Sequence, residues 1–342
     1  MKGLPHMKNR IDTSRKKTPW DDNKEISVTQ KFIKEKYQNN YKLKHSTLND
    51  SMEYELVNLI EIDKCRYCDS TKIRKRGFTS NKIQRYFCND CNKIFTALTN
   101  TIFENHKIQI SEWVEFILDI FYYGSTTLIS KVNKNSINTT ILWLHKLFLI
   151  LEHWQDDIVL EKEIFIDEMF YSVIKSDIKI TSDGKKLRGL SKNQYCIGLG
   201  YDRKNIIAFV EGLGKTSTNK TYRTFKEHIK PKSKIIHDDE KSHNKLVNDL
   251  YLIDKSYNSL YLKTLDDKEN PLRPINHQCD LIRQFLNSHS GFNRNDLQNY
   301  LNLYCFMNSG RKKRLEKVDE LLNLAFKTKV NLKYRDFYKS KK

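Results

Sequence analysis

Four of the seven cysteines form two Cys-x-x-Cys pairs: "CRYC" contains Cys65 and Cys68, and "CNDC" contains Cys88 and Cys91. Each pair can form a tight turn that presents two thiolates, and four thiolates are the ligand set of a closed, structural Zn²⁺ site. In a cytosolic chain, such pairs indicate metal binding more than disulfides. We therefore predict a structural zinc ion in a small β-ribbon. A catalytic zinc is disfavoured because no coordination position stays open.

Acidic residues also occur inside apolar runs. "IFIDEMF" contains Asp167, and "KIIHDDEKSH" ends a second apolar run on Asp238 and Asp239. A carboxylate in a buried run is costly unless it is paired or binds a metal. Strand side chains alternate between faces, so we expect Glu168 to point away from Asp167, and only Asp238 or Asp239 to join it.

Carboxylates on adjacent strands can share divalent cations. Two such ions about 4 Å apart would activate a water or a 3′-hydroxyl and stabilise the leaving oxygen of a phosphodiester. The alternative interpretation of each Asp is a turn or a helix cap.

Basic residues lie near both groups of candidate ligands. Lys and Arg that neutralise DNA phosphates release counterions, so DNA binding is one interpretation, and a solvated charged surface is the other. The candidates between the cysteine pairs are Arg74, Lys75, Arg76, Lys82 and Arg85. The candidates in "GKKLRGLSKNQ" are Lys185, Lys186, Arg188 and Lys192.

The elements that must position these residues can be predicted from the apolar pattern. "EIFIDEMFY", "YCIGLGYD" and "NIIAFVEGL" predict strands, the last two joined by "DRKN" as in a hairpin. "SKIIHDD" predicts a further strand, and "TNKTYRTFKEHI" and "EKSHNKLVNDLY" predict helices. Strands followed by alternating helix and strand indicate a mixed α/β sheet with helices packed on it.

Residues 110–155 have apolar residues at helical spacing, with breaks near Gly124 and Asn133. A DNA-binding helix-turn-helix is one interpretation. The apolar residues of the first helix are better suited to a core than to DNA contacts: Trp113, Phe116, Ile117 and Ile120. A short helix is also expected near "VTQKFIKEKYQ", within an otherwise polar N-terminal segment.

The chain has 342 residues, 38% of them hydrophobic, and a formal net charge of +19. This length predicts two or three domains. The charge favours nucleic acid as a partner over an anionic membrane surface or an acidic protein. No apolar run approaches the ~18 residues of a membrane span, and the basic N-terminus lacks the apolar segment of a secretory signal.

A series of longer blocks follows in a fixed order: "CRYC…CNDC", "TNTIFENHKIQISEW", "IFIDEMF", "RGLSKNQYCIGLGYD", "IIHDDEKSHNKLV", "NPLRPINHQCDLIRQFLNSHSGFNRNDLQNYLNLYCF" and "KYRDFY". Together they resemble bacterial insertion-sequence transposases of the group related to eukaryotic Merlin elements, over roughly residues 60–340. The resemblance implies an RNase H-like catalytic domain that cuts and rejoins DNA with Mg²⁺ or Mn²⁺. It also implies a homo-oligomer that binds the terminal inverted repeats and the target DNA.

The resemblance further implies a catalytic set of two Asp, one Asn and a downstream Lys. By motif, Asp167 in "FIDE", Asp238 in "HDDEKSH" and Asn276 in "PIN" take the first three places. Arg283 in "LIRQFL" stands where the group usually has Lys, which keeps the cation but changes its geometry. Asn276 and Arg283 are about two helical turns apart and therefore share a face. An Asn carbonyl can ligate Mg²⁺, and an Arg can contact a DNA phosphate.

Three alternatives remain for individual residues. Asn276 can instead be the cap of a helix spanning Cys279 to Leu286. Cys279 and Asp280 are rivals for the third ligand, and Asp239 is a rival for Asp238.

We therefore predict an α/β fold, with an RNase H-like mixed sheet and flanking helices preceded by a zinc ribbon and a helix-turn-helix-like segment. The predicted activity is a Mg²⁺-dependent DNA transposase in the cytoplasm, on a bacterial nucleoid, or in the nucleus of a eukaryotic host. The alternatives are a DNA nuclease without strand transfer, a non-catalytic transposase-derived DNA-binding protein, and an RNA-binding zinc-ribbon protein. The predicted boundaries are 1–58 (basic, mostly disordered extension), 59–100 (zinc ribbon), 101–160 (helical DNA-binding segment), 161–308 (catalytic domain) and 309–342 (basic C-terminal helix and tail).

Overall fold

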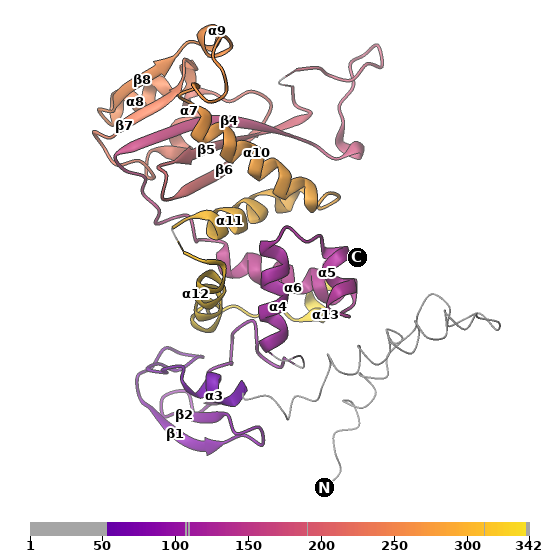
Figure 1. Cartoon of the computed structure of the whole chain (residues 1–342). Coiled ribbons are helices and arrows are strands. Elements are labelled where there is room, and N and C mark those ends of the chain that lie inside the picture. Colours follow the sequence, from indigo (N-terminus) through magenta and orange to yellow (C-terminus); the bar gives the residue numbers. More distant parts are fainter. Residues whose placement is uncertain (1–52, 107, 109, 190, 311, 340–342) are drawn as a thin grey trace, which may run out of the picture. The chain divides into compact units, whose positions relative to one another are not determined.

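A computed structural model describes residues 53–106, 108, 110–189, 191–310 and 312–339 (Figure 1). The chain divides into two compact units. Unit one comprises Met1–Lys146 and Val318–Lys342, and unit two comprises Leu147–Lys317. Unit two is therefore inserted into the chain of unit one. The helix expected near "VTQKFIKEKYQ" lies outside the described residues, and the five predicted boundaries stay predictions.

Unit one contains a small antiparallel sheet in the order β1-β2-β3. Its inner face is apolar: Tyr86 and Phe95 are buried and pack with Cys65 and Cys88. The short helix α3 (Glu53–Asn58) precedes the sheet. The strands are β1 (Ile73–Phe78), β2 (Gln84–Cys88) and β3 (Ile94–Phe95).

The helices of unit one follow the predicted breaks. They are α4 (Ile110–Phe121), α5 (Thr126–Val132) and α6 (Ile137–Leu151). The apolar side chains of α4 form a core, as expected, and Trp113 stacks on Trp143 with 4.3 Å between ring centroids. Along α6, Ile137 and Asn138 are exposed and the other residues are buried or half-buried. DNA recognition by this segment stays a prediction.

The C-terminal segment from Val318 belongs to unit one and contains most of α12 (Arg314–Lys327) and all of α13 (Tyr334–Lys339). The buried Arg66 guanidinium donates a 2.8 Å hydrogen bond to the Phe326 carbonyl oxygen at the end of α12. The Tyr338 hydroxyl donates a 2.8 Å bond to the Asn138 carbonyl oxygen at the start of α6. The segment expected to form one helix and a basic end therefore holds two helices, both bonded within unit one.

Unit two is built on a five-stranded sheet in the order β6-β5-β4-β7-β8. β4, β5 and β6 pair in antiparallel fashion, whereas β7 is parallel to β4, and β8 is parallel to β7. Four strands match the predicted runs: β4 (Glu163–Ser172), β5 (Gln194–Tyr201), β6 (Ile206–Leu213) and β7 (Lys234–Asp238). The fifth strand, β8 (Ile253–Tyr257), was not predicted because its sequence, "IDKSY", is polar and mostly exposed at the sheet edge.

Helices cover this sheet. Side chains along β4 alternate between its two faces and therefore contact different helices. Ile164 and Ile166 enter a core with Phe225 of α7 (Thr218–Phe225) and Leu246 of α8 (Asn244–Asp249). On the other face, the Tyr171 hydroxyl donates a 3.4 Å bond to Asn287 of α10 (Arg273–Ser288). The remaining helices are α9 (Ser259–Leu262) and α11 (Leu297–Asn308), and the 3₁₀ turns are η3 (Lys175–Asp177), η4 (Lys241–His243) and η5 (Arg294–Asp296). Within the described part of the chain, no helix is long and apolar enough to cross a membrane.

Candidate active site and cysteine cluster

Asp167 and Asp238 come together because their strands are neighbours. In the parallel pairing of β4 and β7, Phe165 lies opposite Ile236, and each aspartate lies two residues further along its strand. One carboxylate oxygen from each, and one from Glu168, lie within 4.8 Å of one another. Asp239 is exposed and does not belong to this group.

The electrostatics of this pair are unfavourable without a cation. Burial, with the nearby charge of Asp238, raises the pKa of Asp167 to about 7. Burial also raises the pKa of Asp238. The Oδ1 atom of Asp238 is buried and has no hydrogen-bond partner among the described residues. An orphaned carboxylate oxygen beside a second carboxylate fits a divalent cation, because Mg²⁺ and Ca²⁺ prefer oxygen ligands.

Glu168 has a different environment. Its Oε1 atom accepts a 3.1 Å hydrogen bond from the Ser242 hydroxyl and lies 3.2 Å from Nε2 of His243. The Glu168 and His243 side chains are only 7% and 0% exposed. Burial alone would raise the pKa of Glu168, but the hydrogen bond and charge of His243 lower it overall. The same contact raises the pKa of His243 against the effect of burial. We call Glu168, Ser242 and His243 the Glu168 clasp.

The Glu168 clasp connects β4 to the turn that follows β7. Ser242 and His243 belong to η4, which begins shortly after Asp238. The clasp therefore restrains the end of β7 beside β4, where the two aspartates meet. The Nδ1 atom of His243 lies 2.9 Å from Nδ1 of His237. The Nε2 atom of His237 in turn lies 3.0 Å from a carboxylate oxygen of Asp254.

The expectation that Glu168 points away from Asp167 was incomplete. Alternation does direct Glu168 toward Ser242 and His243, away from the Asp167 face. However, β7 ends at Asp238, so the edge of β4 is open at this point, and the Glu168 carboxylate still reaches the two aspartates. The Ser and His of "HDDEKSH" were the sequence signal for this buried contact.

Asn276 lies inside α10 and is not its cap. The helix spans Arg273–Ser288, which is longer than the predicted Cys279–Leu286. The Asn276 amide donates a 3.0 Å hydrogen bond to the Leu272 carbonyl oxygen. The side chain that bonds at the helix start belongs to Asn270, which accepts from the Leu272 amide at 2.8 Å. The cap interpretation of Asn276 was therefore wrong, and a prolyl residue in the first turn allowed the earlier start.

The α10 helix faces the aspartates through Cys279. Burial raises the pKa of Cys279, and the charge of Asp167 adds to this effect. Asn276 is half-buried and lies one turn before Cys279, on the same side of the helix. Arg283 is exposed and forms a 2.8 Å ion pair with Asp280. The residue predicted to contact a DNA phosphate is thus paired with the residue that was the alternative third metal ligand. The roles of Asn276 and Arg283 stay predictions.

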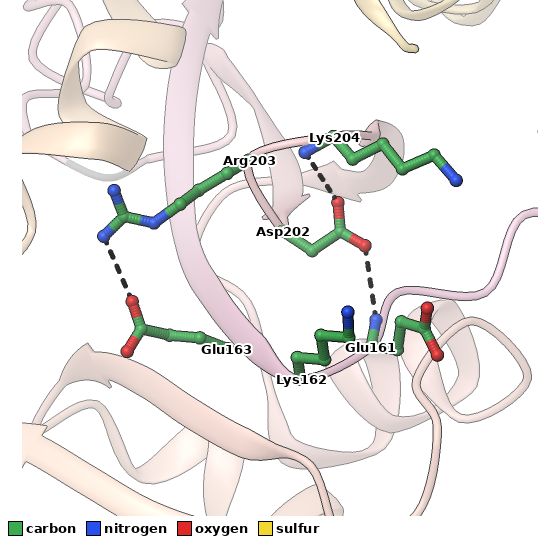
Figure 2. A pocket seen from close by; sticks show the side chains of 6 residues that line it. All are labelled: Glu161, Lys162, Glu163, Asp202, Arg203 and Lys204. Atoms are coloured by element: carbon green, nitrogen blue, oxygen red, sulfur yellow. Dashed lines mark hydrogen bonds and ion pairs between the residues drawn. The ribbon is translucent and has the colours of Figure 1, made fainter. Parts of the chain in front are cut away.

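A cleft of ≈ 530 Å³ lies at the beginning of β4 (Figure 2). Its two glutamates are paired with neighbouring cations, and Asp202 accepts hydrogen bonds from backbone N–H groups. Glu163 is 3.1 Å from Arg203 and 2.9 Å from Lys234, and Glu161 is 3.0 Å from Lys230. No predicted catalytic residue lines this cleft, whose lining is Glu161, Lys162, Glu163, Asp202, Arg203 and Lys204.

The four paired cysteines form one cluster in unit one. All four sulfur atoms lie within 4.8 Å of one another, and the Cys65–Cys91 and Cys68–Cys88 sulfur distances are both 3.6 Å. Four thiolates about 2.3 Å from a tetrahedral zinc ion would have similar sulfur–sulfur distances. The backbone N–H of Cys91 helps to lower the pKa of Cys88 to about 6, whereas burial and the neighbouring thiols raise the pKa of Cys91. One thiolate therefore forms readily, and a bound cation would favour the others.

Each cysteine pair is followed by a residue in the left-handed region: Asp69 has φ 59° and Asn92 has φ 56°. Asp and Asn tolerate this conformation better than most residues, so the sequence suits the tight turns of the cluster.

The basic residues predicted to bind DNA are placed differently from one another. Arg74, Lys75 and Arg76 are exposed on β1. The Lys82 ammonium lies 5.2 Å from the Tyr54 ring centroid, and Nε of Arg85 is buried without a partner among the described residues. The other candidates are exposed in the loop between β4 and β5, which extends away from the sheet (Figure 1): Lys185, Lys186, Arg188 and Lys192.

Comparisons with known proteins give limited similarity. No protein-family model matches the sequence, and no curated protein matches it. Among solved structures, the chain is similar to the Mos1 strand transfer complex, at 10% identity and TM-score 0.27, over 64% of this chain and 76% of that one. It is also similar to the Mos1 mariner paired end complex with Mn, at 10% identity and TM-score 0.21, over 63% and 78%. A pre-cleavage Mos1 transpososome matches at 10% identity and TM-score 0.21, over 94% and 95%. Such low scores establish neither a shared fold nor a shared activity.

Proposed function

We propose that this protein is a DNA transposase that cleaves the ends of an insertion sequence and joins them to target DNA. The observation that carries this proposal is the Asp167–Asp238 pair, which has raised pKa values and an orphaned carboxylate oxygen on adjacent strands. The sheet supports the proposal, because three antiparallel strands followed by two parallel ones are the arrangement expected of an RNase H-like domain.

The residues of unit two divide the work of phosphoryl transfer. Asp167 and Asp238, with the amide oxygen of Asn276, would hold Mg²⁺ or Mn²⁺, which supplies activation of the attacking oxygen and stabilisation of the leaving oxygen. The Glu168 clasp holds Asp238 beside Asp167 without offering its own Oε1 atom. Arg283 would release Asp280 to bind a phosphate of the DNA.

Both units contribute DNA contacts in this proposal. The cysteine cluster holds Zn²⁺ and stabilises a zinc ribbon, because a segment this short gains folding free energy from its metal. The exposed cations of β1 and of the loop between β4 and β5 contact DNA. We also propose a homo-oligomer, since both ends of an element must be joined together.

A strand-transfer assay with the purified full-length protein tests the proposed activity. The substrates are labelled duplexes with free 3′-hydroxyl ends, copied from the DNA on each side of the gene, and a supercoiled plasmid, with Mg²⁺ or Mn²⁺ added. Joining of the label to the plasmid, abolished by Asp167→Asn, is the expected result. Cleavage without joining would favour the nuclease alternative. Products that are unchanged in the Asp167→Asn protein would contradict the assigned site.

A further inference from the structure

The outer face of the small sheet carries a row of side chains that the cysteine cluster does not use. Arg74 lies opposite Phe87, and Phe87 lies opposite Ile94, so these side chains share one face across all three strands. Arg76 follows Arg74 by two residues, within the irregularity of the β1–β2 register between Lys75 and Phe78, and its guanidinium lies over the same Phe87 ring. Arg74 and Arg76 are exposed, Phe87 is half-buried, and Ile94 is 44% exposed. We call these four residues the Phe87 face.

The two arginines are held by the aromatic ring between them. The guanidinium carbons of Arg74 and Arg76 lie 5.1 Å and 5.0 Å from the centroid of the Phe87 ring. Arginine stacked on an aromatic ring keeps its N–H donors free at the edge of the guanidinium plane. Neither guanidinium has an ion pair or a hydrogen-bond acceptor within the described residues. The Phe87 face therefore presents two oriented guanidinium groups whose N–H donors have no partner within the described residues.

The spacing of these guanidinium groups matches DNA. Alternate residues of a strand are about 6.8 Å apart, and successive bases along one DNA strand are about 3.4 Å apart. Arg74 and Arg76 are thus separated by about two base steps. A β-ribbon fits the major groove, where arginine binds the O6 and N7 atoms of guanine and apolar side chains contact the thymine methyl group. The apolar Phe87 and Ile94 suit base edges better than solvated phosphates.

We propose that the Phe87 face enters the major groove of double-stranded DNA, where Arg74 and Arg76 bind guanines two base steps apart. This inference rests on the proposed DNA-binding function and adds the groove, the bases and their spacing. The large positive charge of the chain supplies the complementary, sequence-independent attraction to DNA.

Binding of the zinc-loaded, full-length protein to short fluorescent duplexes tests this assignment. The probes are an AT-only duplex, the same duplex with a central G-x-G, and the same duplex with adjacent guanines. We expect G-x-G to bind about tenfold more tightly than either other probe. Arg74→Lys and Arg76→Lys keep the charge but lose the fork, so they should abolish this preference and retain binding to the AT-only duplex. Phe87→Leu should reduce the preference because it removes the ring that orients both arginines.

Lys75→Ala is the matched control, because Lys75 is exposed on the same strand, opposite Tyr86, on the other face of the sheet. Loss of the Lys75 charge should weaken binding to all three duplexes equally and leave the G-x-G preference unchanged. The zinc content of every variant shows whether the ribbon still folds. Equal affinity for the three duplexes, or wild-type preference in both Lys variants, would overturn the assignment. Strand transfer by a protein without the G-x-G preference would overturn this inference alone, whereas failure to bind or join any DNA would overturn the proposed function.

Discussion

The beginning and the middle of β4 both carry acidic residues, but their environments are opposite. At the beginning of the strand, Glu163 lies between Arg203 and Lys234, and these partners lower its pKa. Further along, Asp167 faces a second carboxylate, and its pKa is raised to about 7. One strand therefore holds a paired acidic side chain that lines a surface cleft (Figure 2) and an unpaired acidic group that a metal cation would complete. Acidic residues alone do not mark a metal site. Among the described residues, Glu163 forms ion pairs with an Arg and a Lys, whereas Asp167 and Asp238 form none.

The largest difference between Asp167 and Glu163 should appear in the rate of strand transfer. Asp167→Asn and Asp238→Asn remove carboxylates proposed to hold the metal, and we expect strand transfer to fall by about 10³-fold or more. Glu163→Gln changes the same kind of side chain on the same strand and should leave the rate within about threefold of wild type, because surface ion pairs contribute little. Initial rates of joining, with circular dichroism to verify folding, make this comparison. Equal losses in Asp167→Asn and Glu163→Gln would contradict it.

The Glu168 clasp should have the next largest effect. Glu168→Ala leaves His243 buried without its acceptor and frees the turn after β7, so we expect activity to fall about 10- to 100-fold, as is typical for groups that orient metal ligands. Glu168→Gln keeps an acceptor for Ser242 and should recover part of this loss. If Glu168 acts only by orienting Asp238, the Mn²⁺ concentration needed for half-maximal rate should increase in Glu168→Ala. A loss of rate with an unchanged Mn²⁺ requirement would instead indicate a role other than metal positioning.

Asn276 should affect the metal requirement in two directions. Asn276→Ala removes the proposed neutral ligand, so about tenfold more Mn²⁺ should be needed for the same rate. Asn276→Asp adds a charged ligand and should lower the requirement. Thermal stability should change little in either variant because Asn276 is not a helix cap. Identical Mn²⁺ curves for the three proteins would exclude Asn276 from the site.

Without Mg²⁺ or Mn²⁺ at the aspartate pair, and with zinc still in the cysteine cluster, ionised Asp167 should destabilise the folded protein. The folded-state pKa of Asp167, about 7, lies above its ordinary value, so the folded state binds the proton more tightly. This contribution is fully present below about pH 4 and is lost as the pH rises through about 7. At pH 8 without metal, Asp167→Asn should therefore unfold at a higher temperature than wild type, by ~2–4 °C for each kcal/mol. Added Mn²⁺ should raise the wild-type unfolding temperature and leave that of Asp167→Asn unchanged. A lower unfolding temperature for metal-free Asp167→Asn would contradict this prediction.

The smallest effect is expected for the stability of a Glu163 variant. Glu163→Gln weakens contacts with Arg203 and Lys234 and should lower the free energy of unfolding by about 0–1 kcal/mol. The loss should shrink in high salt, which screens exposed charges. Added Mn²⁺ should not change it. Chemical denaturation at low and high salt measures the effect, and a gain in stability would show that the cations do not neutralise Glu163.

Much of this organisation could be predicted from sequence because it depends on local pattern. The apolar runs that form β4, β5, β6 and β7 are rich in β-branched and aromatic residues, and Asp167 and Asp238 stood out as charges within two of them. The spacing of the two Cys-x-x-Cys pairs predicted the cluster of four sulfur atoms.

Other features depend on distant parts of the chain and left no local signal. β8 is an exposed edge strand that needs β7 to form, so its polar sequence did not suggest a strand. The start of α10 was misplaced because proline is tolerated in a first helical turn. The pairing of Arg66 with the end of α12 joins residues far apart in sequence, and no periodicity could reveal it.

The insertion of unit two into unit one also fixes an order of events during synthesis. Domains generally fold as units while the chain emerges from the ribosome. Every strand of the five-stranded sheet of unit two is made before Val318, whereas unit one is complete only after α12 and α13, whose residues are translated last. Until then, the Arg66 guanidinium lacks the carbonyl oxygen that it binds in the finished fold. A nascent or prematurely terminated chain would therefore carry the folded sheet of unit two before unit one is complete, and the DNA contacts that we propose for unit one would be the last to form.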